Sequence, residues 1–148
     1  MEIVQIEVID TQNIKKINRA ELVKQLNKVF KYLDIAPGSI SFCLCDNDSI
    51  RELNRKYLFK DRPTDVIAFP LESANETAYL GEVVVSVEEA VRRGAEFKQS
   101  WQKELLLYLV HGILHLKGYN DTTAEAKRIM DARQKEVLGI FGAKAPGV

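Results

Sequence analysis

The feature that most constrains this chain is a long apolar segment that carries both of its histidines. Residues 100–117 are dominated by leucine, valine and isoleucine, with few charged side chains between them. A helix that is apolar nearly all round is covered on most sides and lies at the centre of a fold. Gly118 is a typical residue to end such a helix. We therefore expect a central, buried helix over about residues 100–117.

His111 and His115 stand four residues apart in this segment, so their side chains lie on the same helix face. This spacing lets two imidazoles bind one metal ion. A left-handed residue at Gly118 would turn the chain back and bring Asp121 up as a third ligand. Three protein ligands leave a fourth position for water, which is typical of a catalytic zinc site. The alternative is a pair of neutral core histidines, but the glycine and the carboxylate favour a metal.

The residue after the first histidine shows whether the chain carries the general base of a zinc peptidase. Zinc peptidases with this histidine spacing carry a glutamate there as the general base. Here the position is Gly112. The water must then be activated by the metal, by another carboxylate or by the substrate, and a phosphodiester can take part in metal-assisted attack. The sequence assigns no catalytic side chain beyond this metal-bound water.

The rest of the chain alternates between strand and helix patterns. Alternating or apolar runs predict strands at residues 3–9, 39–45, 65–69 and 81–85. Capping patterns predict helices that start at Asn18, Ser49, Ser86, near Ser100 and at Thr122, the last ending near Gly139. This order predicts one α+β domain over residues 1–148 with a small four-stranded sheet. About residues 142–148 are expected to be a frayed tail.

Composition excludes several classes of protein. The chain has 21 basic and 21 acidic residues and a net charge of zero, which argues against coating nucleic acid by charge alone. No segment has 18 uninterrupted apolar residues, and the first residues lack the pattern of a secretory signal. Cys43 and Cys45 are too close in sequence for an unstrained disulfide and are expected to be free thiols. We expect a cytoplasmic protein without a membrane segment.

Three segments together resemble a known family. HGILHLKGYND at 111–121, LNRKYLFKDRPTDVIAFP at 53–70 and LGEVVVS at 80–86 resemble, in order and spacing, the signatures of the YbeY family of bacterial endoribonucleases. The resemblance covers about residues 40–140. It implies a single domain with a mixed sheet, about five helices and one Zn²⁺, whose first two ligands match His111 and His115. It also implies cleavage of single-stranded RNA, in maturation of the small-subunit ribosomal RNA 3′ end and in ribosome quality control.

Two departures from the family pattern bear on activity. Asp121 stands where the family usually has a third histidine, and its negative charge should make the metal a weaker Lewis acid. Leu58 stands where an arginine usually follows the tyrosine, and leucine offers no planar fork for phosphate. Milder changes are Asn120 for aspartate, Ala68 for serine and Glu82 for aspartate.

Basic residues before the third strand are the candidate RNA contacts. These are Arg51, Arg55, Lys60 and Arg62; a more weakly indicated set is Arg92, Arg93, Lys98 and Lys103. Both sets could instead be ordinary solvated faces. Tyr57, Phe59 and Phe69 could stack bases, although such aromatics are more often core. Thr64 and Asp65 could orient a metal ligand by hydrogen bonds, or could only cap the loop.

Two other functions compete with the nuclease. A ribosome-assembly binding protein, in which the metal serves stability and nuclease activity is reduced or lost, is favoured by Leu58 and Asp121. A metallopeptidase is disfavoured by Gly112. The sequence fits a monomer and ribosomal RNA or the small ribosomal subunit as partner, and it leaves open another divalent transition metal in place of zinc.

Overall fold

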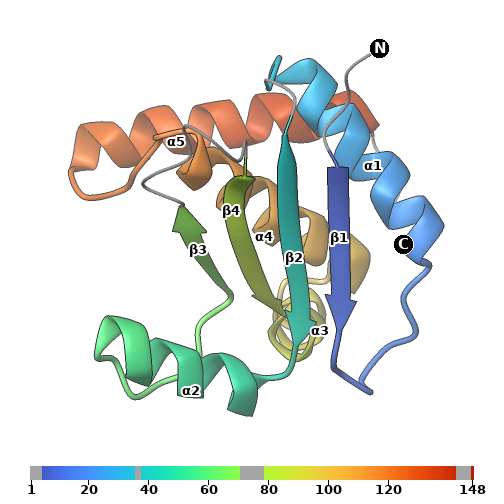
Figure 1. The fold of residues 1–148 in the computed structure, drawn as a ribbon, viewed down its shortest axis with the longest axis vertical. Helices are drawn as coiled ribbons and strands as arrows, with labels where there is room; N and C mark the ends of the chain where they lie inside the picture. Colours follow the sequence, from blue (N-terminus) through green and yellow to red (C-terminus); the bar gives the residue numbers. More distant parts are fainter. Residues whose placement is uncertain (1–4, 36–37, 71–78, 143–147) are drawn as a thin grey trace.

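The computed structural model describes residues 5–35, 38–70, 79–142 and 148. Four strands form one sheet: β1 (Gln5–Asp10), β2 (Ser39–Cys45), β3 (Val66–Pro70) and β4 (Tyr79–Ser86). Their order is β1-β2-β4-β3, as Figure 1 shows. β1, β2 and β4 are parallel, and β3 runs antiparallel to β4 at the edge. The four-stranded sheet that the sequence pattern predicted and the mixed pairing that the resemblance implied are therefore confirmed.

Five α-helices and one short 3-10 helix accompany the strands: α1 (Arg19–Tyr32), α2 (Asn47–Leu58), α3 (Val87–Glu96), α4 (Trp101–Leu116), α5 (Ala124–Leu138) and η1 (Gly139–Phe141). The predicted N-caps of α1, α3 and α4 are confirmed, because Asn18, Ser86 and Ser100 each accept a backbone N–H three residues on. The sheet and helices form the single small α+β domain that the sequence predicted.

Two predicted helix starts were wrong. α2 begins at Asn47, because Asp46 caps it and accepts the N–H of Ser49, the residue predicted as the cap. α5 is capped by Thr123, whose hydroxyl accepts the N–H of Ala126, and not by Thr122. In both places two or more capping residue types are adjacent, so the capping pattern alone could not select the register.

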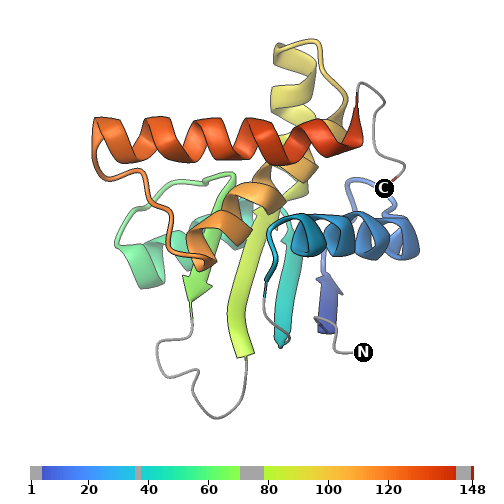
Figure 2. The ribbon, with the colours of Figure 1, turned by 90° about the horizontal axis from the view of Figure 1, so that it is seen from above.

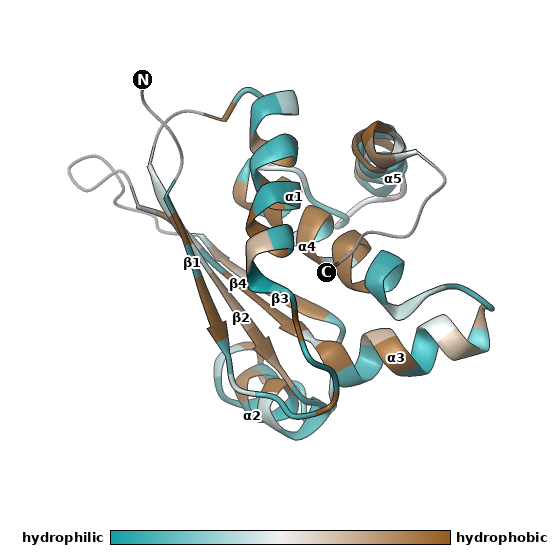
Figure 3. Ribbon diagram, turned by 90° about the vertical axis from the view of Figure 1, so that its right-hand side faces the viewer, coloured by the Kyte–Doolittle hydropathy of each residue, from teal (hydrophilic) through white to brown (hydrophobic). Residues whose placement is uncertain are grey.

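The helices cover the two faces of the sheet unequally. α1, α3, α4 and α5 lie on one face, and α2 packs against the other (Figures 2 and 3). α4 lies between the sheet and α5 and packs against α3, β3 and β4. Leu105, Leu109 and Ile113 of α4 are fully buried in the main core with Phe42 and Val83. The prediction of a central, buried helix is confirmed.

The end of the chain contacts this core. Val148 is 5% exposed and packs in the main hydrophobic cluster. Its backbone carbonyl accepts the N–H of Asn18 at 3.2 Å. The prediction of a frayed tail is therefore wrong for Val148. Burial of its apolar side chain contributes more free energy than the conformational entropy that an ordered chain end loses. Residues 143–147 of the predicted tail lie outside the described residues. Within the described part, no helix is both long and apolar enough to cross a membrane.

Candidate metal centre

The two histidines project from α4 toward one point. Leu105, Leu109 and Ile113 bury one face of this helix, so His111 and His115 lie half-buried on another. Their Nε2 atoms are 3.1 Å apart, and the two rings meet edge to face with centroids 4.7 Å apart. The helical spacing thus places two imidazole nitrogens where they can share one ligand.

The turn after α4 brings the carboxylate to the same point. Gly118 has a positive φ of 105°, and its N–H donates to the carbonyl of His115 at 3.0 Å. The next N–H, that of Tyr119, donates to Leu114, which closes the helix end. The reversed chain carries the exposed Asp121 back to the histidines, and one ligand atom from each of the three residues lies within 4.8 Å of the others. This group could hold a metal ion.

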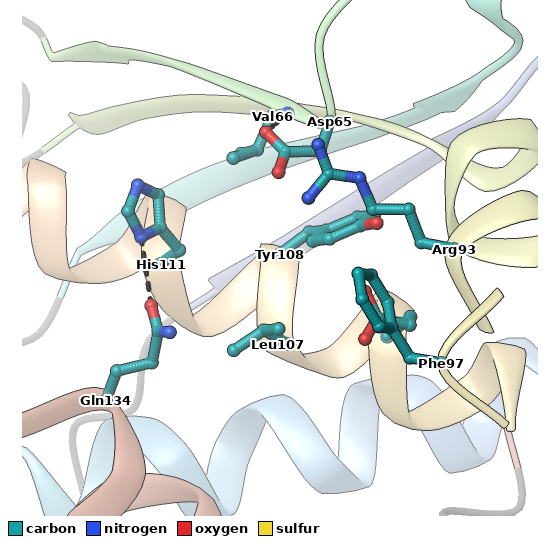
Figure 4. A pocket seen from close by; sticks show the side chains of 9 residues that line it. Asp65, Val66, Arg93, Phe97, Leu107, Tyr108, His111 and Gln134 are labelled. Carbon is teal, nitrogen blue, oxygen red and sulfur yellow. Dashed lines mark hydrogen bonds between the residues drawn. The ribbon is translucent and has the colours of Figure 1, made fainter. Parts of the chain in front are cut away.

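A residue that the sequence did not indicate fixes the first histidine. Nδ1 of His111 donates a hydrogen bond to Oε1 of Gln134 in α5 at 2.9 Å (Figure 4). With its proton on Nδ1, a neutral imidazole keeps the lone pair on Nε2 free for a metal. Gln134 lies 23 residues after His111 in an otherwise ordinary amphipathic helix. Only the packing of α5 on α4 reveals its role.

Electrostatics favour the neutral form of the second histidine. Burial lowers the pKa of His115 below its usual value, and the neighbouring His111 lowers it further. The carboxylate of Asp121 and a hydrogen bond with the backbone of Tyr119 oppose this shift without cancelling it. His115 is therefore neutral near pH 7, which is the state that binds metal.

The donor set fits a zinc-like ion. Two nitrogens bound to one tetrahedral Zn²⁺ at about 2.0–2.1 Å stand about 3.3 Å apart. The observed separation of the two Nε2 atoms is 3.1 Å. Imidazole nitrogen and carboxylate oxygen are both accepted zinc ligands, and three protein ligands leave a position open. Asp121 is exposed on a turn, so its carboxylate oxygen can move the remaining distance to an ion held by the two histidine nitrogens.

Gly112 lies where the helix touches the sheet. A β-carbon at this position would stand 2.4 Å from Cγ1 of Val83 and 3.3 Å from Cγ2 of Val66. No side chain fits there without displacing the helix, and a glutamate least of all. The absence of the peptidase base is therefore enforced by packing between α4 and β4, which strengthens the argument against a peptidase.

The predicted RNA-contact residues lie apart from the histidines. Arg51 and Arg55 are exposed on α2, where Arg51 pairs with Asp61 at 2.9 Å and Arg55 pairs with Glu52. Lys60 and Arg62 are exposed in the loop that follows. α2 packs on the face of the sheet opposite α4. The four basic residues thus form a surface on α2 and the next loop, and their role remains a prediction.

Asp65 lies closer to the metal centre, and Thr64 precedes it in the loop. Asp65 lines a cavity that His111 and Gln134 also line. Its Oδ1 accepts the N–H of Val66 at 2.8 Å and the hydroxyl of Thr64 at 3.4 Å. These bonds organise the start of β3. Gln134 makes the hydrogen bond to His111, and an orienting role of Thr64 and Asp65 toward a metal ligand stays a prediction.

Comparison with known proteins shows the family of this chain. The family model described as Endoribonuclease YbeY matches residues 5–142. An Endoribonuclease YbeY of Geobacillus thermodenitrificans is 36% identical over 94% of this chain and 97% of that protein. One from Carboxydothermus hydrogenoformans is 40% identical over 71% of this chain and 73% of that protein. The solution structure of a Thermotoga maritima protein matches with a TM-score of 0.65 and 28% identity, over 91% and 87% of the two chains. The chain thus belongs to the YbeY family of endoribonucleases.

Proposed function

We propose that this protein is a zinc-dependent endoribonuclease that cleaves single-stranded regions of ribosomal RNA. Its expected roles are maturation of the small-subunit RNA 3′ end and ribosome quality control, in the cytoplasm and as a monomer. The observation that carries the proposal is the 3.1 Å approach of the two histidine Nε2 atoms beside Asp121. The names of the relatives, each an endoribonuclease, support RNA as the substrate.

His111, His115 and Asp121 would hold the ion, which when bound supplies a Lewis acid for a phosphoryl oxygen and activates water. Gln134 holds the His111 ring in the tautomer whose Nε2 is free. The depressed pKa of His115 keeps its imidazole neutral at neutral pH, so that one ring nitrogen carries a free lone pair. Gly112 packs against Val83 of the sheet and supplies no general base, so the metal-bound water would be activated without a glutamate at that position.

Exposed cations on α2 and its following loop would track the RNA backbone. The pairs of Arg51 with Asp61 and of Arg55 with Glu52 are solvent-exposed, and such pairs are weak. Phosphates can therefore displace the carboxylates at small cost. Reversing the charge of Arg55 and Lys60 together should weaken RNA binding and flatten its dependence on salt. Unchanged affinity across a salt series would indicate an ordinary solvated face.

The first experiment measures metal and cleavage on the same samples. Purified wild-type protein and His111→Ala are compared for metal content by mass spectrometry and for cleavage of a single-stranded RNA. One equivalent of zinc and RNA cleavage, both lost in the variant, would support the enzyme. A full equivalent of a different transition metal would show that the bound ion is not zinc and would leave the rest of the proposal intact. No bound metal would refute the site.

A second candidate function is a metal-stabilised ribosome-assembly protein with reduced or lost nuclease activity. Asp121 and Leu58, which stand where the resemblance implies a histidine and an arginine, favour it. Leu58 and the adjacent Phe59 are 47% and 90% exposed at the end of α2 and offer an apolar contact. The two candidate functions predict different results when His111→Ala is expressed in a cell that lacks the protein. Rescue by His111→Ala would favour the binding protein, and failure of a folded His111→Ala protein to rescue would favour the enzyme.

A further inference from the structure

A cavity of about 230 Å³ opens directly beside the metal centre. Four elements meet around it: the start of β3, the end of α3, the middle of α4 and α5. His111 and Gln134 form the wall that it shares with the metal centre (Figure 4). Pockets for whole drug-sized ligands measure about 300–1,000 Å³, so this one suits a single nucleotide unit of a longer chain.

Arg93 supplies the positive charge of this cavity. Among the described residues that line it, Arg93 is the one cation. Its Nε donates to Oε2 of Glu89 at 3.2 Å, and its guanidinium extends over Tyr108 toward Asp65 (Figure 4). A guanidinium carries five N–H donors, so its terminal nitrogens can still bind a phosphate. Its side chain is 43% exposed, so a ligand can reach it.

The remaining wall offers contacts that a base needs. Phe97 ends α3, is 62% exposed, and its N–H donates to the carbonyl of Arg93 at 2.9 Å. An exposed aromatic ring held at a fixed place can stack on a base. Glu104 also lines the cavity; its side chain is buried, and its carboxylate accepts a hydrogen bond from Gln99 at 2.6 Å. Burial, together with this carboxylate, raises the pKa of Tyr108, whose hydroxyl therefore stays neutral.

We propose that this cavity is a nucleotide subsite that holds the nucleotide next to the scissile phosphate, with Arg93 contacting the phosphate and Phe97 stacking on the base. The inference rests on the proposed ribonuclease function. Arg93 presents a planar phosphate-binding group in the cavity that His111 also lines.

The neighbouring arginine provides a matched control. Arg92 pairs with the same Glu89, at 2.6 Å, and also with Glu96, but it is not among the residues that line the cavity. Arg92→Ala and Arg93→Ala therefore remove the same charge from the same helix and each break a bond to Glu89. Only Arg93→Ala should impair the proposed nucleotide subsite, because only Arg93 lines the cavity.

The variants are compared in cleavage of a single-stranded RNA by metal-loaded protein at several salt concentrations. Arg93→Ala should lower kcat/KM by about tenfold to a hundredfold, the usual loss for a charge-assisted hydrogen bond. The slope of log affinity for RNA against log salt concentration should fall in magnitude by about one. The zinc content and melting temperature of this variant should equal those of Arg92→Ala. Arg93→Lys should recover part of the loss, and Phe97→Leu should weaken RNA binding about tenfold. Equal effects of Arg92→Ala and Arg93→Ala would overturn the subsite.

A second measurement separates this inference from the proposed function. Binding of a nucleoside 5′-monophosphate to the zinc-loaded protein is followed by calorimetry. Binding that Arg93→Ala loses and Arg92→Ala keeps supports the subsite even if no RNA is cleaved, in which case only the nuclease proposal fails. A wild-type protein that binds the nucleotide no more tightly than Arg93→Ala overturns the subsite, whatever its activity.

Discussion

Replacing Gly112 with alanine tests how closely α4 must approach β4. The added β-carbon would lie 2.4 Å from Cγ1 and 3.1 Å from Cγ2 of Val83. Carbon atoms that are not bonded prefer about 3.5–4.0 Å, so the helix and strand must separate by about 1 Å. Val83 is fully buried in β4, and Gly112 lies within α4. Neither can move without disturbing its neighbours in a close-packed core.

The free energy of unfolding should fall as a result. Overpacking a core costs about 1–3 kcal/mol, and the severity of this overlap places it at the upper end. Alanine is a better helix former than glycine by about 1 kcal/mol, which offsets part of the loss. We expect a net loss of about 2 kcal/mol, and a melting temperature lower by about 4–8 °C for a chain of this size.

Urea denaturation of the metal-free protein, followed by circular dichroism, measures this loss. Val83→Ala removes both methyl groups that the new β-carbon would meet. The double variant should therefore be more stable than the sum of the two single losses predicts, by about 1–3 kcal/mol. Gly139→Ala is the control, because its β-carbon would meet nothing within 4 Å. Wild-type stability of Gly112→Ala, or strict additivity with Val83→Ala, would refute the packing argument.

Four further predictions concern the site and its surroundings. Gln134→Leu should weaken zinc binding about tenfold to a hundredfold with little change in fold, measured by competition with a chelator, because His111 loses its orienting hydrogen bond. Asp121→His should raise cleavage near neutral pH, because it removes a negative charge from the metal; equal or lower rates would count against this reasoning. Phe59→Ala should weaken RNA binding without loss of stability, because its ring is 90% exposed; unchanged binding would leave Phe59 without a role in RNA contact. Hydrogen bonds from two arginines lower the pKa of Glu89, so its carboxylate stabilises the fold above its ordinary pKa near 4.5 and loses this effect as the pH falls below it. Glu89→Gln should therefore flatten the acid limb of a stability-against-pH curve, and an unchanged curve would contradict the assignment.

Much of the site could be predicted from sequence because it is local. His111, His115, Gly118 and Asp121 lie within eleven residues, and helix geometry with one glycine turn determines their relative positions. Strand β2 was predicted with its observed bounds, because an apolar run between turn residues is also a local signal. The starts of α2 and α5 were missed where adjacent capping residues competed.

The parts that sequence could not supply depend on contacts between distant segments. Gln134 is one polar residue in a helix with many, and only its packing against α4 distinguishes it. Arg93 was one of eight candidate basic residues, and the cavity beside His111 selects it. Arg51 and Arg55 were predicted as RNA contacts, and only the structure places α2 on the face of the sheet opposite α4.

Local sequence signals were enough to predict one buried helix with two imidazoles on one face and a glycine turn that returns a carboxylate to them. Helical periodicity and backbone stereochemistry act over a few residues, so they can be read without a fold. The tertiary structure alone decided that Gly112 must remain without a side chain, that Gln134 orients His111, and that a cavity with Arg93 adjoins the metal centre. These features depend on the distances between α3, α4, α5 and the sheet, which are set by the packing of side chains far apart in the chain.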